Sequence, residues 1–200
     1  NILNRIEFNK KMIYSDTLKL ALKLKKYKIG VTCCDAGSAN IIFDFLHSLS
    51  INHFLIYIEG PAINICKAKF PNKINMTLNV FLDEIDFLIT GTSWSSSIEH
   101  NIRGVAKSRN IRTVATLDHW TSYKERFQFN SQFILPDEIW VFDKYALNIA
   151  KKEFKKTPIA LLKNFYLENQ IKNIKLKSKL KNFGQQTIVY ILEPIRTKWL

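Results

Sequence analysis

Short runs of apolar residues recur along the chain and alternate with segments whose apolar residues have helical spacing. The runs are four to six residues long with little polar interruption, which is typical of strands buried on both faces of a sheet. We predict strands at Val31–Cys34, Phe54–Ile58, Phe87–Thr90, Arg112–Leu117 and Glu138–Phe142. We predict helices at 41–49, at 98–109, at 144–154 and in a short segment ending at Ala68. The alternation predicts an α/β fold, a Rossmann-like three-layer αβα domain with a parallel sheet and right-handed crossovers.

The two ends of the chain show a different pattern. Ser15-Asp16-Thr17 precedes an apolar stripe that starts at Leu18, so we expect a helix to begin there. After Pro158 the sequence predicts a short strand at 159–162, a helix at 166–174 and a strand at 187–192. We divide the chain into a basic N-terminal helix (1–27), a Rossmann-like domain (28–165), a lysine-rich linker (166–186) and the first strand of a second domain (187–200).

The charge of the chain is unevenly placed. The 200 residues include 30 Lys and Arg against 17 Asp and Glu, which gives a net charge of +13. The net charge is +5 over residues 1–27, −2 over 28–143 and +9 over 144–182. The central part is nearly neutral, which argues against nucleic acid as the partner. The basic flanks fit a charged linker or contact with an anionic membrane surface.

Hydropathy and cysteine content suggest a location. The sequence has no window near the roughly 18 apolar residues that span a bilayer, and its first residues carry charges where an export signal has an apolar run. Three cysteines, two of them adjacent at Cys33 and Cys34, cannot form a disulfide framework. We expect a cytoplasmic protein that the basic flanks place on the inner face of the membrane.

Small and polar residues follow the first and third predicted strands, at the end where ligands bind in a parallel sheet. The first loop starts Asp35-Ala36-Gly37-Ser38, and the second starts Gly91-Thr92-Ser93. Backbone N–H groups and hydroxyls there suit a phosphate or a polyol. Neither loop has the spacing of a dinucleotide or P-loop fingerprint, and the alternatives are a tight turn in the first loop and a helix cap in the second. The predicted substrate-binding residues here are Asp35, Gly37, Ser38, Gly91, Thr92 and Ser93.

The densest group of reactive side chains follows the fourth predicted strand. His119 suits a general base near neutral pH, and Asp118 is the second predicted catalytic residue, although adjacent residues at a strand end point in opposite directions. Trp120 offers a stacking face, and Lys124 and Arg126 suit a phosphate. The alternative is an ordinary surface loop. No histidine or cysteine pair has metal-ligand spacing, so we predict neither a metal nor a cofactor besides a nucleotide-sugar as substrate.

The segment from Gly91 to Asp143 contains a strand, a Gly-Thr-Ser loop, a helix, a strand ending in Asp118-His119-Trp120, and the run Leu135-Pro136-Asp137-Glu138. This order resembles the N-terminal Rossmann-like half of GT-B glycosyltransferases and of UDP-N-acetylglucosamine 2-epimerases, over residues 28–195. In that superfamily an Asn-Pro element precedes the linker. Lys163-Asn164-Phe165 lies in its place here, with phenylalanine where proline is usual.

The resemblance implies that this domain binds the acceptor, that the loop after the first strand approaches the donor phosphates, and that a C-terminal domain holds most of the nucleotide-sugar. We therefore expect a metal-independent glycosyltransferase, or its acceptor-binding half, acting on a surface-polysaccharide or lipid-linked acceptor. Two alternatives are a nucleotide-sugar 2-epimerase and a non-catalytic Rossmann-like module that binds a ligand or a protein. A nucleic-acid binder is the weakest alternative, because Lys172–Lys181 contains no aromatic residue to stack on bases.

Overall fold

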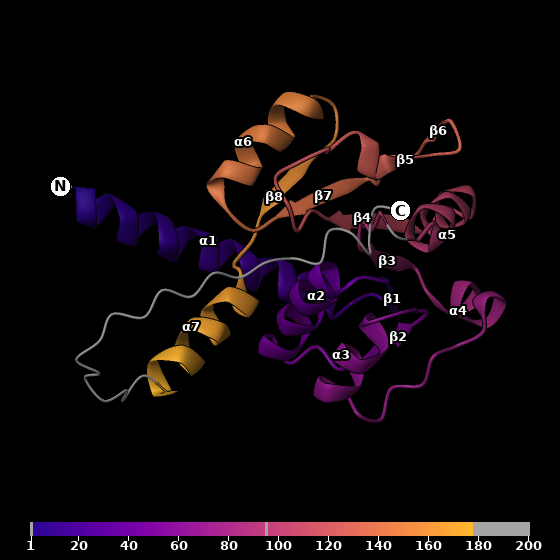
Figure 1. The fold of residues 1–200 in the computed structure, drawn as a ribbon, viewed down its shortest axis with the longest axis horizontal. Coiled ribbons are helices and arrows are strands. Elements are labelled where there is room, and N and C mark those ends of the chain that lie inside the picture. The colour runs from indigo at the N-terminus through magenta and orange to yellow at the C-terminus, as the bar shows by residue number, and fades with distance from the viewer. Residues whose placement is uncertain (1, 95, 178–200) are drawn as a thin grey trace, which may run out of the picture. The chain divides into compact units, whose positions relative to one another are not determined.

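The computed structural model describes the backbone of residues 2–94 and 96–177 and the side chains of residues 12–94 and 96–174. Strands and helices alternate through most of this part of the chain (Figure 1). The elements are α1 (Ile2–Leu24), β1 (Ile29–Thr32), α2 (Ala36–Ser48), β2 (Phe54–Ile56), α3 (Ala62–Lys69), α4 (Leu78–Glu84), β3 (Phe87–Thr90), α5 (Ile98–Ser108), β4 (Arg112–Thr116), a 3-10 turn (Glu125–Phe127), β5 (Gln128–Phe129), β6 (Gln132–Phe133), β7 (Glu138–Val141), α6 (Lys144–Glu153), β8 (Ile159–Leu161) and α7 (Phe165–Lys177).

Within the described residues, six strands form one parallel sheet in the order β2-β1-β3-β4-β7-β8. Val31 of β1 lies in register with Ile56 of β2 on one side and with Ile89 of β3 on the other. The predicted α/β fold with a Rossmann-like three-layer arrangement is confirmed. The strand order reverses between β1 and β3, because β2 lies on one side of β1 and all later strands lie on the other. At such a reversal the loops at the carboxyl ends of the strands diverge and leave room for a ligand.

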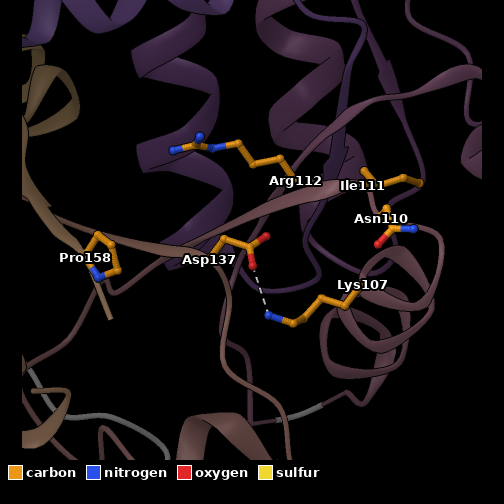
Figure 2. Close-up of a pocket in the computed structure, with 6 residues that line it drawn as sticks. All are labelled: Lys107, Asn110, Ile111, Arg112, Asp137 and Pro158. Carbon is orange, nitrogen blue, oxygen red and sulfur yellow. Dashed lines mark hydrogen bonds and ion pairs between the residues drawn. The ribbon is translucent and has the colours of Figure 1, made fainter. Parts of the chain in front are cut away.

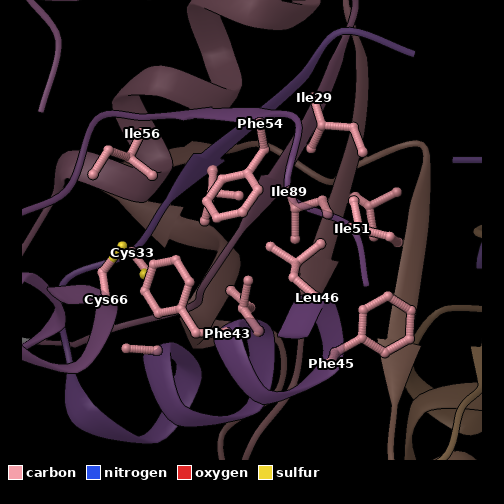
Figure 3. Packing of buried hydrophobic residues seen from close by; sticks show 14 of the residues in the cluster. Ile29, Cys33, Phe43, Phe45, Leu46, Ile51, Phe54, Ile56, Cys66 and Ile89 are labelled. Atoms are coloured by element: carbon pink, nitrogen blue, oxygen red, sulfur yellow. The ribbon is translucent and has the colours of Figure 1, made fainter. Parts of the chain in front are cut away.

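Alternate residues of each strand face opposite layers of helices. In β3, Phe87 and Ile89 join a core with α1, α2 and α3, whereas Leu88 joins a core with α4 and α5. In β7, Ile139 and Val141 pack with α6. Figure 3 shows the first of these cores, where side chains of α2 meet those of the central strands. Because the sheet is buried on both faces, its strands are nearly continuous apolar runs in the sequence.

Two predicted helix starts are wrong. α1 begins at Ile2 and not near Ser15, because Thr17 lies inside the helix, where its hydroxyl donates to Ile13 O (2.7 Å) and caps nothing. α2 begins at Ala36 with Asp35 as its N-cap, so the segment predicted as a loop up to Asn40 is the first turn of the helix. α4 and the β5–β6 hairpin have no counterpart in the prediction, because elements this short have too few apolar positions to show a period.

The chain divides into two compact units, Asn1–Glu168 and Asn169–Leu200. α1 belongs to the first unit, since Ala21 and Leu24 are buried in the core that contains β1 and α2. The strand predicted at 187–192 and the end of the predicted linker lie outside the described residues. Of the helices in the described part of the chain, none combines the length and apolar character needed to cross a bilayer.

Candidate functional site

One buried carboxyl group joins the loops that follow β1 and β3. Glu99, in the first turn of α5, accepts hydrogen bonds from Cys34 N (3.0 Å) and Ser93 N (3.0 Å), which lie on either side of the strand-order reversal. Glu99 is only 2% exposed. Burial and the neighbouring Asp35 raise the pKa of Glu99 to about 7, against the lowering effect of the two N–H donors and of Arg103. Glu99 therefore changes its protonation near neutral pH.

Two glycines allow polar groups to approach one another at this edge. A Cβ atom added to Gly37 would collide with the Asp118 carboxylate. One added to Gly91 would lie 2.5 Å from Ser38 Oγ and 2.6 Å from Glu99 Oε1. The loops after β1, β3 and β4 therefore meet at separations that only glycine permits.

Asp35 and Ser38 form the cap of α2. Asp35 Oδ1 accepts hydrogen bonds from Ser38 N (2.8 Å) and Ser38 Oγ (2.7 Å), and Ser38 is fully buried. The negative charge of Asp35 raises the pKa of both Glu99 and Asp118. Three carboxyl groups, from three different loops or helices, thus influence one another at the carboxyl edge of the sheet.

Arg126 is the cation beside Asp118. Its Nη1 lies 3.4 Å from Asp118 Oδ1 and donates to Thr92 O (2.9 Å), while its Nε donates to Thr121 O (3.1 Å). Burial and Asp35 raise the pKa of Asp118, and Arg126 opposes that rise. Arg126 ties the loop after β4 to the loop after β3, and three protein oxygens already use much of its donor capacity.

A pocket of about 220 Å³ opens beside this group, at the carboxyl ends of β4 and β7. Its walls come from the loop after β4, the first turn of α6 and the segment between β8 and α7. The polar residues that line it are Asp118, His119, Trp120, Asp143 and Asn164. The pocket lies over β4 and β7, at the end of the sheet where parallel sheets bind ligands, and not over the reversal between β1 and β3 itself.

His119 and Trp120 are exposed side chains of the pocket. His119 Nδ1 lies 3.1 Å from Thr121 Oγ1, which orients the ring and leaves Nε2 for a substrate. Trp120 Nε1 donates to Asp143 Oδ2 (2.9 Å), and its ring meets that of Tyr145 edge to face, with centroids 5.8 Å apart. Trp120 and Tyr145 are 56% and 64% exposed, so an open aromatic pair adjoins the pocket.

The structure gathers most of the predicted site residues and places one of them elsewhere. Lys124 Nζ pairs with Glu153 Oε2 (2.9 Å) near the end of α6, away from the pocket. Thr92 lies at the carboxyl edge, but its hydroxyl is buried and donates to Thr116 O (3.0 Å) at the end of β4. The other residues brought to the carboxyl edge are Asp35, Gly37, Ser38, Gly91, Ser93, Asp118, His119, Trp120 and Arg126.

Glu99 and Asp143 are not among the residues that the sequence predicted for the site. The sequence could have indicated that Glu99 is buried, because this acid lies next to Ile98 and one turn before Ile102, on the apolar face of its helix. A charge on a buried face needs a partner, and the partners of Glu99 are backbone N–H groups that the sequence does not reveal. Asp143 directly follows a strand and caps α6 by accepting from Ala146 N (2.7 Å).

A second hollow, of about 560 Å³, lies at the opposite, amino end of the strands (Figure 2). Lys107 Nζ donates to Asp137 Oδ1 (3.0 Å) there, and Arg112 pairs with Glu138 (3.0 Å). This hollow is larger, but its charged groups are matched with each other and lie at the end of the sheet where parallel folds do not bind ligands. We therefore place the candidate site at the smaller pocket.

Comparisons with models of protein families, with curated proteins and with solved structures found no match to this chain. Among the residues that the structure describes, no group of three or more His, Cys, Asp and Glu side chains is arranged to hold a metal ion. The function is therefore inferred from the geometry and chemistry of the pocket.

Proposed function

We propose that this chain is a GT-B-like glycosyltransferase, or its acceptor-binding half, and that its pocket receives the acceptor hydroxyl. The donor is a nucleotide-sugar, the acceptor is a surface-polysaccharide or lipid-linked sugar, and no metal is assigned to the reaction. One observation carries the proposal: an exposed imidazole, carboxyl groups and an exposed tryptophan share one pocket at the carboxyl edge of a parallel sheet.

The side chains around the pocket suit a sugar. A sugar presents hydroxyl groups along its edge and an apolar C–H face. The carboxylates of Asp118 and Asp143 and the amide of Asn164 are hydrogen-bonding partners for hydroxyl groups. The exposed rings of Trp120 and Tyr145 offer faces on which the C–H side of a sugar packs. Polar side chains beside exposed aromatic rings therefore support a carbohydrate as the ligand.

The charges at this edge favour the acceptor over the donor diphosphate. Asp35, Glu99 and Asp118 are three acids in close reach. Arg126, the cation next to Asp118, already bonds Asp118, Thr92 O and Thr121 O. Arg103, the cation that acts on Glu99, is fully buried and donates to Ile134 O. A diphosphate brings negative charge and needs free donors, which these groups do not supply. A neutral, hydroxyl-rich acceptor suits them better, in keeping with an acceptor-binding role.

In the proposed reaction His119 is the general base. Its Nε2 removes the proton from an acceptor hydroxyl as that oxygen attacks the anomeric carbon of the donor sugar. The bond from the anomeric carbon to the diphosphate oxygen breaks, and the nucleoside diphosphate leaves with the electron pair. Thr121 holds the imidazole in place through Nδ1 (3.1 Å). Asp118 lies at the same pocket and stabilises the positive charge that the imidazole acquires.

Mass spectrometry of reaction products tests the proposal. The full-length protein is incubated with a panel of nucleotide-sugars and sugar acceptors, and the expected result is an acceptor enlarged by one sugar. Replacement His119→Ala should lower the rate by about 10²–10⁴-fold, the usual contribution of a general base. His53→Ala is the matched control, because His53 is exposed and lies outside the pocket.

Two outcomes would contradict the assignment. No product with any donor, or full activity in His119→Ala, would reject transfer catalysed by this histidine. Incorporation of solvent deuterium into the donor sugar without any acceptor would instead indicate a nucleotide-sugar epimerase.

The basic flank supports an anionic membrane surface as a partner of the same enzyme. Tyr14, Leu18 and Leu22 are exposed at four-residue spacing along α1, and Lys19 and Lys23 lie beside them. An apolar stripe bordered by lysines is suited to lie on an anionic bilayer. Vesicle flotation should show binding that requires acidic lipid and falls about fivefold for each lysine neutralised. Equal flotation with neutral and acidic vesicles would reject this partner.

A further inference from the structure

We propose that a groove beside the pocket binds the hydrocarbon chain of a lipid-linked acceptor and that Lys144 and Lys163 hold the acceptor's phosphate. The inference rests on the proposed function and deepens it, because it selects lipid-linked acceptors over free polysaccharide. The occupant has one long alkyl or isoprenoid chain, a phosphate and a sugar.

The groove has a volume of about 490 Å³ and lies between α1, the end of β8 and the first residues of α6 and α7. Most of its lining is apolar. The apolar lining residues are Ile13, Tyr14, Phe142, Leu161, Leu162 and Leu167. Such a surface gains free energy by covering a hydrocarbon chain and removing it from water.

The fold holds the groove open by fixing α1 next to the sheet's last described strand. Lys163 N, just after β8, donates to Thr17 Oγ1 (3.1 Å), and Thr17 Oγ1 donates to Ile13 O (2.7 Å). Thr17 is fully buried at this junction. The junction joins residues 146 positions apart in the chain and sets the width of the groove.

The groove continues into the candidate pocket. Phe142, Asp143, Asn164 and Leu167 line both cavities. A chain that lies in the groove would therefore carry its attached sugar towards the imidazole of His119. This continuity ties the groove to the proposed chemistry and distinguishes it from an isolated apolar depression.

Two lysines supply positive charge in the same groove. Lys163 Nζ lies 4.4 Å from the centre of the Tyr14 ring and pairs with Glu168 (3.0 Å), and Lys144 is exposed at the start of α6. The Asp143 carboxylate nearby already accepts from Trp120 Nε1 and from Ala146 N. An apolar trough with two ammonium groups matches a molecule that joins a hydrocarbon chain to a phosphate.

Binding of simple alkyl phosphates tests the groove without requiring the natural acceptor. Octyl, decyl and dodecyl phosphate are titrated into the full chain by calorimetry, each below its micelle concentration. The affinity should rise roughly two- to fourfold for each added methylene until the groove is filled. Inorganic phosphate should bind far more weakly than any of the three.

Two matched variants locate the binding. Leu167→Asp places a charge in the groove at a residue that is 53% exposed, so folding should be unaffected, and the chain-length dependence should disappear. Val80→Asp is the control, because Val80 is 48% exposed on α4 and lines neither the groove nor the candidate pocket. Lys144→Gln should weaken dodecyl phosphate about fivefold and leave a neutral dodecyl glycoside unchanged.

Equal affinity for all three chain lengths would overturn the proposal. Finding a second copy or another segment of this chain in the groove would overturn it too. Equal loss in Leu167→Asp and Val80→Asp would overturn it as well. The two proposals fail separately. Absence of sugar transfer together with intact chain-length dependence rejects the proposed function, whereas transfer to a water-soluble acceptor with a flat chain-length profile rejects the lipid groove.

Discussion

The two edges of the sheet carry similar side chains in opposite environments. At the carboxyl edge, Asp118 and Glu99 are largely buried, and burial raises the pKa of both groups. At the amino edge, burial alone would raise the pKa of Asp137, but hydrogen bonds from Thr113 N (2.7 Å) and from Lys107 Nζ (3.0 Å) outweigh it and hold that pKa below its usual range.

The difference is the reason for placing the candidate site at the carboxyl edge. The ion pairs at the amino edge match Lys107 with Asp137 and Arg112 with Glu138, and they hold α5 and β4 to the start of β7. At the carboxyl edge Arg126 lowers the pKa of Asp118 and Arg103 lowers that of Glu99, yet both pKa values stay raised, and Glu99 can gain or lose a proton near neutral pH. Perturbed carboxyl groups in a cleft are characteristic of functional sites, whereas satisfied surface pairs are characteristic of structural support.

The largest expected effect on stability comes from Glu99. Its folded pKa of about 7 exceeds the ordinary value of 4.5, so the folded state binds the proton more tightly than the unfolded state does. Stability should therefore fall as pH rises from about 4.5 to about 7, by up to about 3 kcal/mol. In Glu99→Gln this contribution should vanish, although one backbone N–H loses its acceptor at a cost of about 1–3 kcal/mol. Urea unfolding between pH 5 and pH 8 measures both effects.

The exposed Glu125 provides the control for this experiment. Glu125→Gln should keep the pH dependence of the wild type. Asp118 contributes to the same trend in every variant, so the difference between curves isolates Glu99. If stability depends on pH in the same way in the wild type and in Glu99→Gln, the pKa of Glu99 is not raised, and the described difference between the two edges is wrong.

An intermediate effect is expected from the close packing at the carboxyl edge. Gly91→Ala places a methyl group against Ser38 and Glu99 and should destabilise the protein by about 2 kcal/mol. Gly104→Ala is the matched change within α5, where the new methyl group meets the flexible end of Ile134 at 3.0 Å. Alanine is the better helix former, so this variant should be neutral or up to about 1 kcal/mol more stable. Thermal unfolding compares the two, and equal changes would contradict the packing argument.

The smallest effect is expected at the amino edge. The lowered pKa of Asp137 means that its contribution to stability is present above the unfolded pKa of about 4 and is lost as pH falls through the folded value. Because the side chain is 43% exposed, solvent screening limits this contribution to about 1 kcal/mol or less. Asp137→Asn should therefore differ from the wild type at pH 6 and match it near pH 2. If the proposed function holds, Asp137→Asn should leave the rate of sugar transfer unchanged. A large loss of transfer in this variant would show that the site lies at the amino edge and not at the carboxyl edge.

Much of the fold follows from local patterns. Phe87–Thr90 is predicted and observed as the same strand, and the strands predicted at Arg112 and Glu138 begin at those residues. An apolar run flanked by polar turns is a local signal, and burial on both faces makes it strong. The starts of α1 and α2 are exceptions. α1 starts at Ile2, well before Ser15-Asp16-Thr17, and α2 starts at Ala36, within the segment predicted as a loop.

The candidate site follows only in part from such patterns. A parallel sheet brings the carboxyl ends of its strands to one edge, which is why Asp35, Gly91 and Asp118 could be grouped without coordinates. The direction of each side chain could not be assigned in this way. Arg126, predicted as a phosphate ligand, instead fastens two loops, and Lys124, two residues earlier, points to Glu153.

The sequence by itself determined the class of fold and the edge of the sheet to examine, because strand and helix periods and the residues that end them act over a few positions. Only the tertiary structure decided which side chains meet. The partners of Glu99 include Cys34, 65 positions away, and the groove wall joins Thr17 to Lys163, 146 positions away. Which of these residues meet depends on the order of strands in the sheet and on how closely glycines let loops approach. No local sequence pattern predicts either of these.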